Sequence, residues 1–203
     1  MTAGILVRRA PGAVMADLDR FIRAPGTHPM LRNHLVAWRE GVADLARQRD
    51  LRSHPDPAAL RALAARWLET TPNERLAHVY LPENARPRLL WLRAELSRAF
   101  EEEGDRRRAA EWLYLLAVAD RLLEYRFFPL ADLYLAECVL SYADTPAAPV
   151  CLREYEAYVE FFYTGTAGTA VPPEVAAQLA RLRRHLEGAR PRASQPASQG
   201  VRP

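Results

Sequence analysis

The chain contains no lysine, because all 28 of its basic residues are arginine. Schiff-base enzymes and pyridoxal-phosphate enzymes need a lysine amine. A P-loop needs a lysine at the β- and γ-phosphates, and a protein kinase needs one on its third strand. The sequence therefore excludes these classes of protein, whether the absence reflects function or only codon usage.

Cysteines and long apolar runs are also scarce. The two cysteines, Cys138 and Cys151, lie in apolar helical segments, where we expect free thiols packed as small hydrophobes. A disulfide or a reactive thiol is the alternative. No apolar run is long enough for a membrane span. Arg8 and Arg9 follow a short apolar run instead of preceding a long one, so we expect no signal peptide and a cytoplasmic location.

The residue patterns of metal sites and nucleophilic enzymes are missing as well. No two histidines are four residues apart, and none follows a glutamate by three, which excludes zincin and ferritin-like di-iron patterns. There is no Gly-x-Ser-x-Gly elbow. The small-residue segment 163–170 lacks a Walker lysine and dinucleotide spacing, so it is interpreted as a connector. We therefore predict no catalytic residue, no metal and no cofactor.

What is present is helical periodicity. Isoleucine occurs only at positions 5 and 22, and alternating β-strand patterns are absent. Apolar spacing and capping residues predict an all-α fold, an irregular or tetratricopeptide-like bundle of about eight or nine antiparallel helices. The expected helical segments are 13–23, 28–49, one from 57, 72–81, 86–103, one from 106, 130–142, 146–163 and one from 173. We expect an N-terminal extension (1–12), a single domain (13–187) and a disordered basic tail (188–203).

One helical hairpin has a recognisable spacing. Leu96, Phe100, Gly104, Ala109 and Leu113 fit two helices joined at a glycine, with a small residue where they approach. Residues 86–121 thereby resemble one tetratricopeptide repeat. The resemblance implies stacked helical hairpins with a concave surface that binds peptides or proteins. Ser97 and Arg93 depart from the family pattern, and a generic antiparallel hairpin would obey the same packing rules.

Charge is unevenly distributed, although the net charge is only +3. Residues 101–150 are mainly acidic and both flanks are basic, so a continuous phosphate-binding face is not expected. At 101–108 an acidic run meets Arg106, Arg107 and Arg108 across a turn. This turn is either a charged docking site or a solvated turn whose charges neutralise each other.

Aromatic residues crowd the second half of the chain. Most should be core, but adjacent aromatics point about 100° apart on a helix, so at least one of each set can leave the core. We therefore select Phe127, Phe128, Phe161 and Tyr163, together with the three arginines of the turn, as candidate partner-binding residues.

These patterns favour a non-enzymatic protein-interaction module, either an adaptor or an assembly chaperone, with a protein partner. The first alternative is a helical enzyme in which Asp132 and Glu137 gather with other acids at a bundle core. The second is a nucleic-acid-associated protein that uses arginine clusters and the tail, and the acidic centre argues against it. Its clusters would be Arg106–Arg108, Arg181, Arg183 and Arg184.

Overall fold

The computed structural model describes residues 11–48, 53–68, 82–123, 130–166 and 168–189. These ranges contain eight α-helices with sequential antiparallel packing, so the all-α prediction is confirmed. The helices are α2 (Pro11–Arg23), α3 (Pro29–Gln48), α4 (Pro57–Trp67), α6 (Arg86–Glu102), α7 (Arg106–Leu122), α8 (Leu130–Ser141), α9 (Ala148–Tyr163) and α10 (Pro173–Ala189). A 3-10 turn, η1 (Glu83–Ala85), precedes α6.

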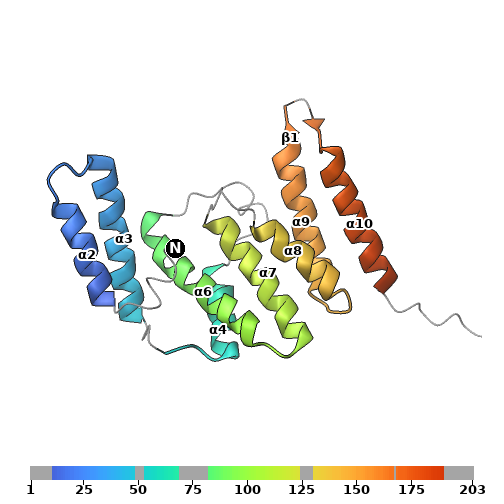
Figure 1. Ribbon diagram of the computed structural model, residues 1–203, viewed down its shortest axis with the longest axis horizontal. Coiled ribbons are helices and arrows are strands. Elements are labelled where there is room, and N and C mark those ends of the chain that lie inside the picture. The colour runs from blue at the N-terminus through green and yellow to red at the C-terminus, as the bar shows by residue number, and fades with distance from the viewer. Residues whose placement is uncertain (1–10, 49–52, 69–81, 124–129, 167, 190–203) are drawn as a thin grey trace, which may run out of the picture.

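The helices form an extended array (Figure 1), with the α2–α3 hairpin at one end and the α9–α10 pair at the other. Helix α7 lies between two hydrophobic cores. Trp112 and Leu116 face the core built with α2, α3, α4 and α6, whereas Leu113 and Ala117 face the core built with α8, α9 and α10. This double coverage explains why the apolar segment 109–119 is largely buried, as its composition predicts.

Two predicted helix starts are confirmed by their caps. The Asp56 side chain accepts a hydrogen bond from the Ala59 amide at 2.8 Å, and Asp105 accepts one from the Arg108 amide at 3.0 Å. The start predicted at Thr145-Pro146 is wrong, because α9 begins at Ala148. The Thr145 hydroxyl instead donates to the Tyr142 carbonyl at 2.7 Å and closes the turn that follows α8.

Helices α6 and α7 form the hairpin that the repeat-like spacing predicts, although its turn does not require glycine. A Cβ at Gly104 would meet nothing within 4 Å, and its φ is not in the left-handed region. Arg93, which departs from the repeat pattern, pairs with the buried Asp120 of α7, and its Nη2 lies 3.3 Å from the Tyr134 hydroxyl of α8. The hairpin is therefore held by an ion pair that the family pattern does not contain.

The expectation of free thiols is wrong. Cys138 of α8 and Cys151 of α9 form a disulfide, and both residues are completely buried in the second core. The two cysteines are 13 residues apart in the sequence and meet because they lie at facing positions on two adjacent antiparallel helices. From the sequence only the apolar surroundings of the two cysteines could be read, and these suit a thiol and a disulfide equally well.

The connector between α9 and α10 contains a small two-stranded ladder that the residue pattern did not predict. Strands β1 (Thr164–Gly165) and β2 (Gly168–Thr169) pair antiparallel. The Thr164 and Thr169 hydroxyls lie 2.7 Å apart, and Gly168 has a φ of 104°, which favours glycine.

Several predicted features lie outside the described residues. They are residues 1–10 of the extension, the helix at 72–81, the aromatics Phe127 and Phe128, and residues 190–203 of the tail. At the domain ends, α2 starts at Pro11 and α10 continues to Ala189. No helix in the described part of the chain is long and apolar enough to cross a membrane.

Candidate interaction surfaces

Arg106, the first arginine of the charged turn, is bound within the molecule. It donates hydrogen bonds to the Ser141 carbonyl at the end of α8 at 2.6 Å and to Asp144 at 3.0 Å. Its guanidinium also lies 5.2 Å from the centre of the Tyr142 ring. The hydrogen bond from Arg106 lowers the pKa of the Asp144 carboxyl. Arg106 therefore fastens α7 to the end of α8, where a cation suits the helix dipole.

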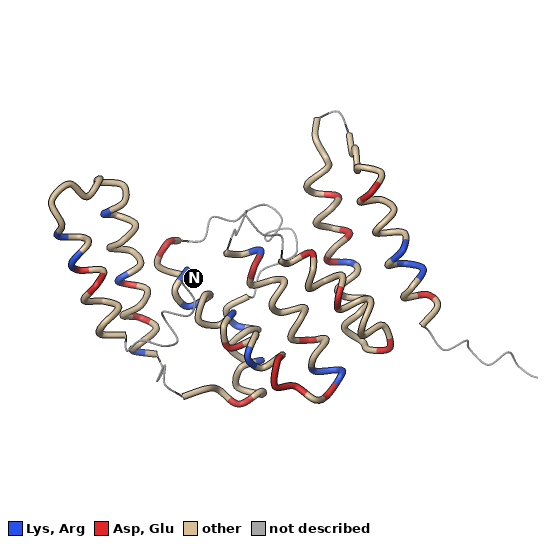
Figure 2. The backbone as a smooth tube through the Cα atoms, viewed as in Figure 1, with Lys and Arg blue, Asp and Glu red and all other residues tan. Residues whose placement is uncertain are grey.

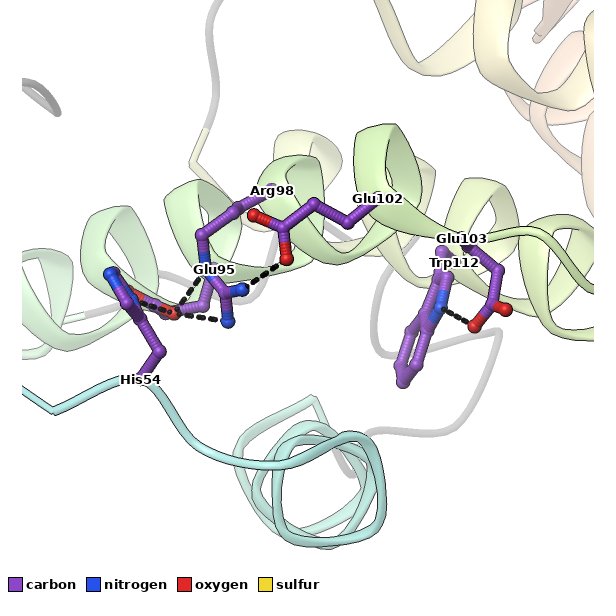
Figure 3. Close-up of polar contacts among 6 residues, drawn as sticks. All are labelled: His54, Glu95, Arg98, Glu102, Glu103 and Trp112. Atoms are coloured by element: carbon purple, nitrogen blue, oxygen red, sulfur yellow. Dashed lines mark hydrogen bonds and ion pairs between the residues drawn. The ribbon is translucent and has the colours of Figure 1, made fainter.

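Arg108, the third arginine, is also engaged. It donates to Glu103 at 2.9 Å, and the Asp105 amide donates to the same carboxylate. The Trp112 indole also donates to Glu103, at 3.3 Å (Figure 3). The bond from Arg108 is the main reason that the pKa of Glu103 is lowered. Arg107 is exposed and makes no ion pair with the described residues. Of the three predicted arginines, Arg107 is thus the one that is exposed without an ion pair in the described part of the chain.

A second group of carboxylates on α6 also serves internal contacts. Glu95 is only 2 % exposed, and its oxygens lie 2.9–3.0 Å from Nδ1 of His54. Arg98 donates to the same carboxylate and, through Nη1, to Glu102 at 2.6 Å (Figure 3). This network attaches the segment before α4 to α6. Glu95 was not among the residues selected from the sequence, although a carboxylate among the buried apolar residues of α6 was the signal that could have identified it.

The carboxylates of the enzyme hypothesis do not come together. Asp132 lies 3.8 Å from Nη2 of Arg121, and burial raises the pKa of Asp132 to about 6 despite that cation. Arg121 also pairs with the buried Glu154 at 3.0 Å, and its guanidinium lies 4.1 Å from the centre of the Tyr158 ring. Glu137 is exposed and accepts a hydrogen bond from Ser141. Asp132 therefore belongs to an arginine-centred packing cluster between α7, α8 and α9.

The remaining question for the described residues is whether they include a metal-binding cluster or a cavity that could hold a small ligand. No group of three or more histidine, cysteine, aspartate or glutamate residues there could hold a metal. A polar cavity of about 200 Å³ lies between α3, η1 and the start of α6. Its volume is below the roughly 300–1,000 Å³ of typical ligand sites. Its lining is Gly41, Asp44, Leu45, Gln48, Pro82, Asn84, Ala85 and Arg88.

The aromatic end of α9 is partly exposed. Phe161 is 39 % exposed and Phe162, which follows it, is 53 % exposed. Phe162 also packs on the Tyr158 ring with the centres 4.6 Å apart. Tyr163 packs against the second core. Of the two described aromatics selected from the sequence, only Phe161 is exposed, and the more exposed Phe162 was not selected.

A larger apolar exposure lies at the other end, where α2 turns into α3. Phe21 is 56 % exposed, Met30 is 67 % exposed and Leu31 is 54 % exposed. On α3 the stripe Leu31, Leu35, Trp38, Val42 and Leu45 is buried progressively along the helix, and Val42 and Leu45 are inaccessible. The stripe thus continues past the edge of the core. We call Phe21, Met30 and Leu31 the hairpin tip.

The sequence alone does not reveal the hairpin tip, because Leu31 has the same apolar spacing as the buried residues of its stripe. The apolar spacing on α3 is correct, but spacing identifies a face and not the length of helix that other helices cover. The charge pattern was the available signal, since residues 20–36 include three arginines and no aspartate or glutamate.

Comparison with known proteins gives no relative. No protein-family description, curated protein or solved structure matches the chain.

Proposed function

We propose that the protein is a non-enzymatic interaction module, an adaptor or assembly chaperone, and that the hairpin tip is its main contact with a protein partner. One observation carries this proposal: the apolar stripe of α3 is continuous in sequence, yet its first turns are uncovered. Clustered large apolar side chains on a surface are typical of sites that bind other macromolecules.

The hairpin is suited to this role by its position. In the packing of the helices, α2 contacts mainly α3, and the hairpin stands at one end of the array (Figure 1). A partner could therefore extend the core over Phe21, Met30 and Leu31 without displacing a helix. The exposed end of α9 with Phe161 and Phe162 is a second, smaller candidate contact.

The alternatives find less support in the described residues. The enzyme hypothesis lacks a shared site for Asp132 and Glu137, as their separate contacts indicate. The nucleic-acid hypothesis is weakened because Arg106 and Arg108 are bound to carboxylates of the protein itself. Arg183 likewise pairs with Glu156 at 2.5 Å. At the α6–α7 turn an acidic stretch lies directly beside the arginines (Figure 2), which weakens a phosphate-binding face.

The expected cytoplasmic location stays a prediction. The Cys138–Cys151 disulfide favours an oxidising environment, although its complete burial would also slow reduction.

The function is tested by affinity capture from cells that make the protein, with wild type, the variant Met30→Glu/Leu31→Glu and the control Arg181→Glu/Arg184→Glu. Both control residues are exposed on α10. A protein captured by wild type and control, but not by the tip variant, is then purified for calorimetry. We expect one-to-one binding that the tip variant weakens at least about 100-fold, the scale of a hot-spot loss. A partner that binds all three proteins equally would contradict the proposal.

A further inference from the structure

The stretch of sequence that forms the hairpin tip carries arginine and no acid, and the nearest acids along α2 are Asp17 and Asp19, just before it. Residues 20–36 include Arg20, Arg23 and Arg32 and contain no aspartate or glutamate. The apolar side chains of the tip come from the same stretch. A partner that covers this surface must therefore bury apolar groups while facing guanidinium groups at the rim.

The tip is held in one shape by its own turn. The Ala24 amide and the Thr27 hydroxyl both donate to the Phe21 carbonyl, at 3.2 and 2.8 Å. The Thr27 amide donates to the Ala24 carbonyl at 3.3 Å, and Gly26 adopts a φ of 85°, which favours glycine. A surface fixed before binding loses little conformational entropy when a partner arrives.

Much of the positive charge at the rim is available to a partner. Arg20 pairs with Asp17, but its side chain is 71 % exposed. Arg23 is 80 % exposed, and its nearest carboxylate, Asp19, lies 4.0 Å away and is already bound to Arg39 at 2.6 Å. Arg32 is exposed, and among the described residues its guanidinium donates only to the Thr27 carbonyl, at a long 3.5 Å.

We propose that the tip binds an acidic amphipathic protein segment, whose apolar side chains cover Phe21, Met30 and Leu31 and whose carboxylates meet Arg23 and Arg32. This inference rests on the proposed function and adds the chemistry of the partner. Complementary charge at the rim of an apolar contact increases the association rate and excludes basic partners.

Two other occupants fit the observations less well. Lipid-binding surfaces use clusters of about four to eight basic residues, whereas the stretch 20–36 that forms the tip and its rim has three arginines. A second copy of the chain offers the acidic run 101–103, but Glu102 and Glu103 are bound to Arg98 and Arg108.

The test is a selection from a display library of random peptides of about 14 residues, long enough for four helical turns. The baits are the full chain and the tip variant Met30→Glu/Leu31→Glu. Peptides enriched only by wild type are sequenced, and the affinity of the leading peptide is measured at low and high salt. The charge variant Arg23→Glu/Arg32→Glu is compared with the control Arg181→Glu/Arg184→Glu, which changes net charge equally. Circular dichroism verifies that every variant is folded.

We expect enriched peptides to combine acidic residues with spaced Leu, Phe or Trp. The leading peptide should bind the Arg23→Glu/Arg32→Glu variant at least about tenfold more weakly at low salt, and the control within about twofold, because the effect is local. Neutral or basic peptides that still need Met30 and Leu31 would overturn the acidic-partner inference and leave the proposed function standing.

Other outcomes separate the remaining occupants. No enrichment over the tip variant would remove support for both proposals. Binding to vesicles of three parts phosphatidylcholine to one part phosphatidylserine, without peptide enrichment, would assign the tip to a lipid surface and overturn the inference. Reversible dimerisation in sedimentation that the tip variant abolishes would assign the surface to a second copy and overturn it too.

Discussion

The two ends of the helical array differ in how completely the apolar faces of their helices are covered. At the C-terminal end, α8 packs against α7, α9 and α10, and the Cys138–Cys151 disulfide joins it to α9. At the N-terminal end, the stripe of α3 is buried at Leu45 and half exposed at Leu31. An apolar stripe is therefore core only where a neighbouring helix is long enough to cover it.

The ends also differ in how they place arginine. Arg121 is buried between α7, α8 and α9 beside Glu154 and the Tyr158 ring. The side chains of Arg20 and Arg23, beside the hairpin tip, are mostly exposed to solvent. In the C-terminal bundle the charge lies inside the packing of the helices, whereas the arginine side chains of the hairpin are mostly exposed to solvent.

The largest expected effect comes from removing the buried cation. Arg121→Met leaves Glu154 buried without its partner, so the free energy of unfolding should fall by about 3–5 kcal/mol in urea denaturation. Arg121→Met/Glu154→Leu should recover part of this loss, because Glu154 is then no longer a buried charge without a partner, while Asp132 still loses its cation. A loss below about 1 kcal/mol in the single variant would show that the cluster contributes little.

Reducing the disulfide should weaken the C-terminal bundle selectively. Opening a crosslink between residues 13 apart should cost about 3 kcal/mol of stability. Hydrogen exchange with and without reductant should show faster exchange in α8 and α9, while α3 stays unchanged. Equal acceleration in α3 would mean that the two ends unfold as one unit.

The pH dependence of stability should reveal Asp132. Its pKa in the folded state is raised to about 6 from 3.8, because burial opposes the charged form more strongly than Arg121 favours it. As pH rises, Asp132 loses its proton at a lower pH in the unfolded chain than in the folded protein. The contribution of Asp132 to the free energy of unfolding is therefore full below pH 3.8 and is lost as pH rises through about 6. Glu154, Tyr155 and Tyr158 face the same cluster from α9.

Asp132→Asn should therefore stabilise the protein at neutral pH by at most about 3 kcal/mol and flatten the pH profile between roughly pH 4 and 6. Glu137→Gln is the control, because that carboxylate is exposed on the same helix. An unchanged profile in Asp132→Asn would show that the carboxylate is well solvated.

Gly41→Ala tests how the hairpin is attached to the central helices. A Cβ at this position would collide with the Asn84 carbonyl oxygen of η1. We expect a loss of about 1–3 kcal/mol in thermal or chemical unfolding, as for an overpacked core. Gly104→Ala is the matched control and should not destabilise, because a Cβ there meets nothing within 4 Å. Equal losses would show that backbone conformation decides the effect and not the close approach.

The smallest effect on stability is expected at the tip. Leu31→Ala should change the free energy of unfolding by less than about 0.5 kcal/mol, because this side chain is mostly in water. Leu45→Ala, on the same stripe, should cost about 2–5 kcal/mol. Similar losses at the two positions in urea titrations would mean that the uncovered end of α3 packs inside the molecule in solution.

Local signals account for the parts of the fold that could be predicted. Asp56 and Asp105 cap helices because a short polar side chain before a helix satisfies a free amide, and this depends on a few adjacent residues. The predicted start at Thr145 failed because its hydroxyl closes the preceding turn. Of the predicted site residues, Arg106 and Arg108 find partners within the protein, which no local pattern could indicate.

The sequence by itself determined the helices, their apolar faces and most of their ends, because these depend on residues within one or two turns of each other. Only the tertiary structure decided that Cys138 meets Cys151, that Arg121 is enclosed and that Leu31 is left in water. Those outcomes depend on which helices become neighbours and how far each extends along the next, and periodicity within one helix carries no information about either.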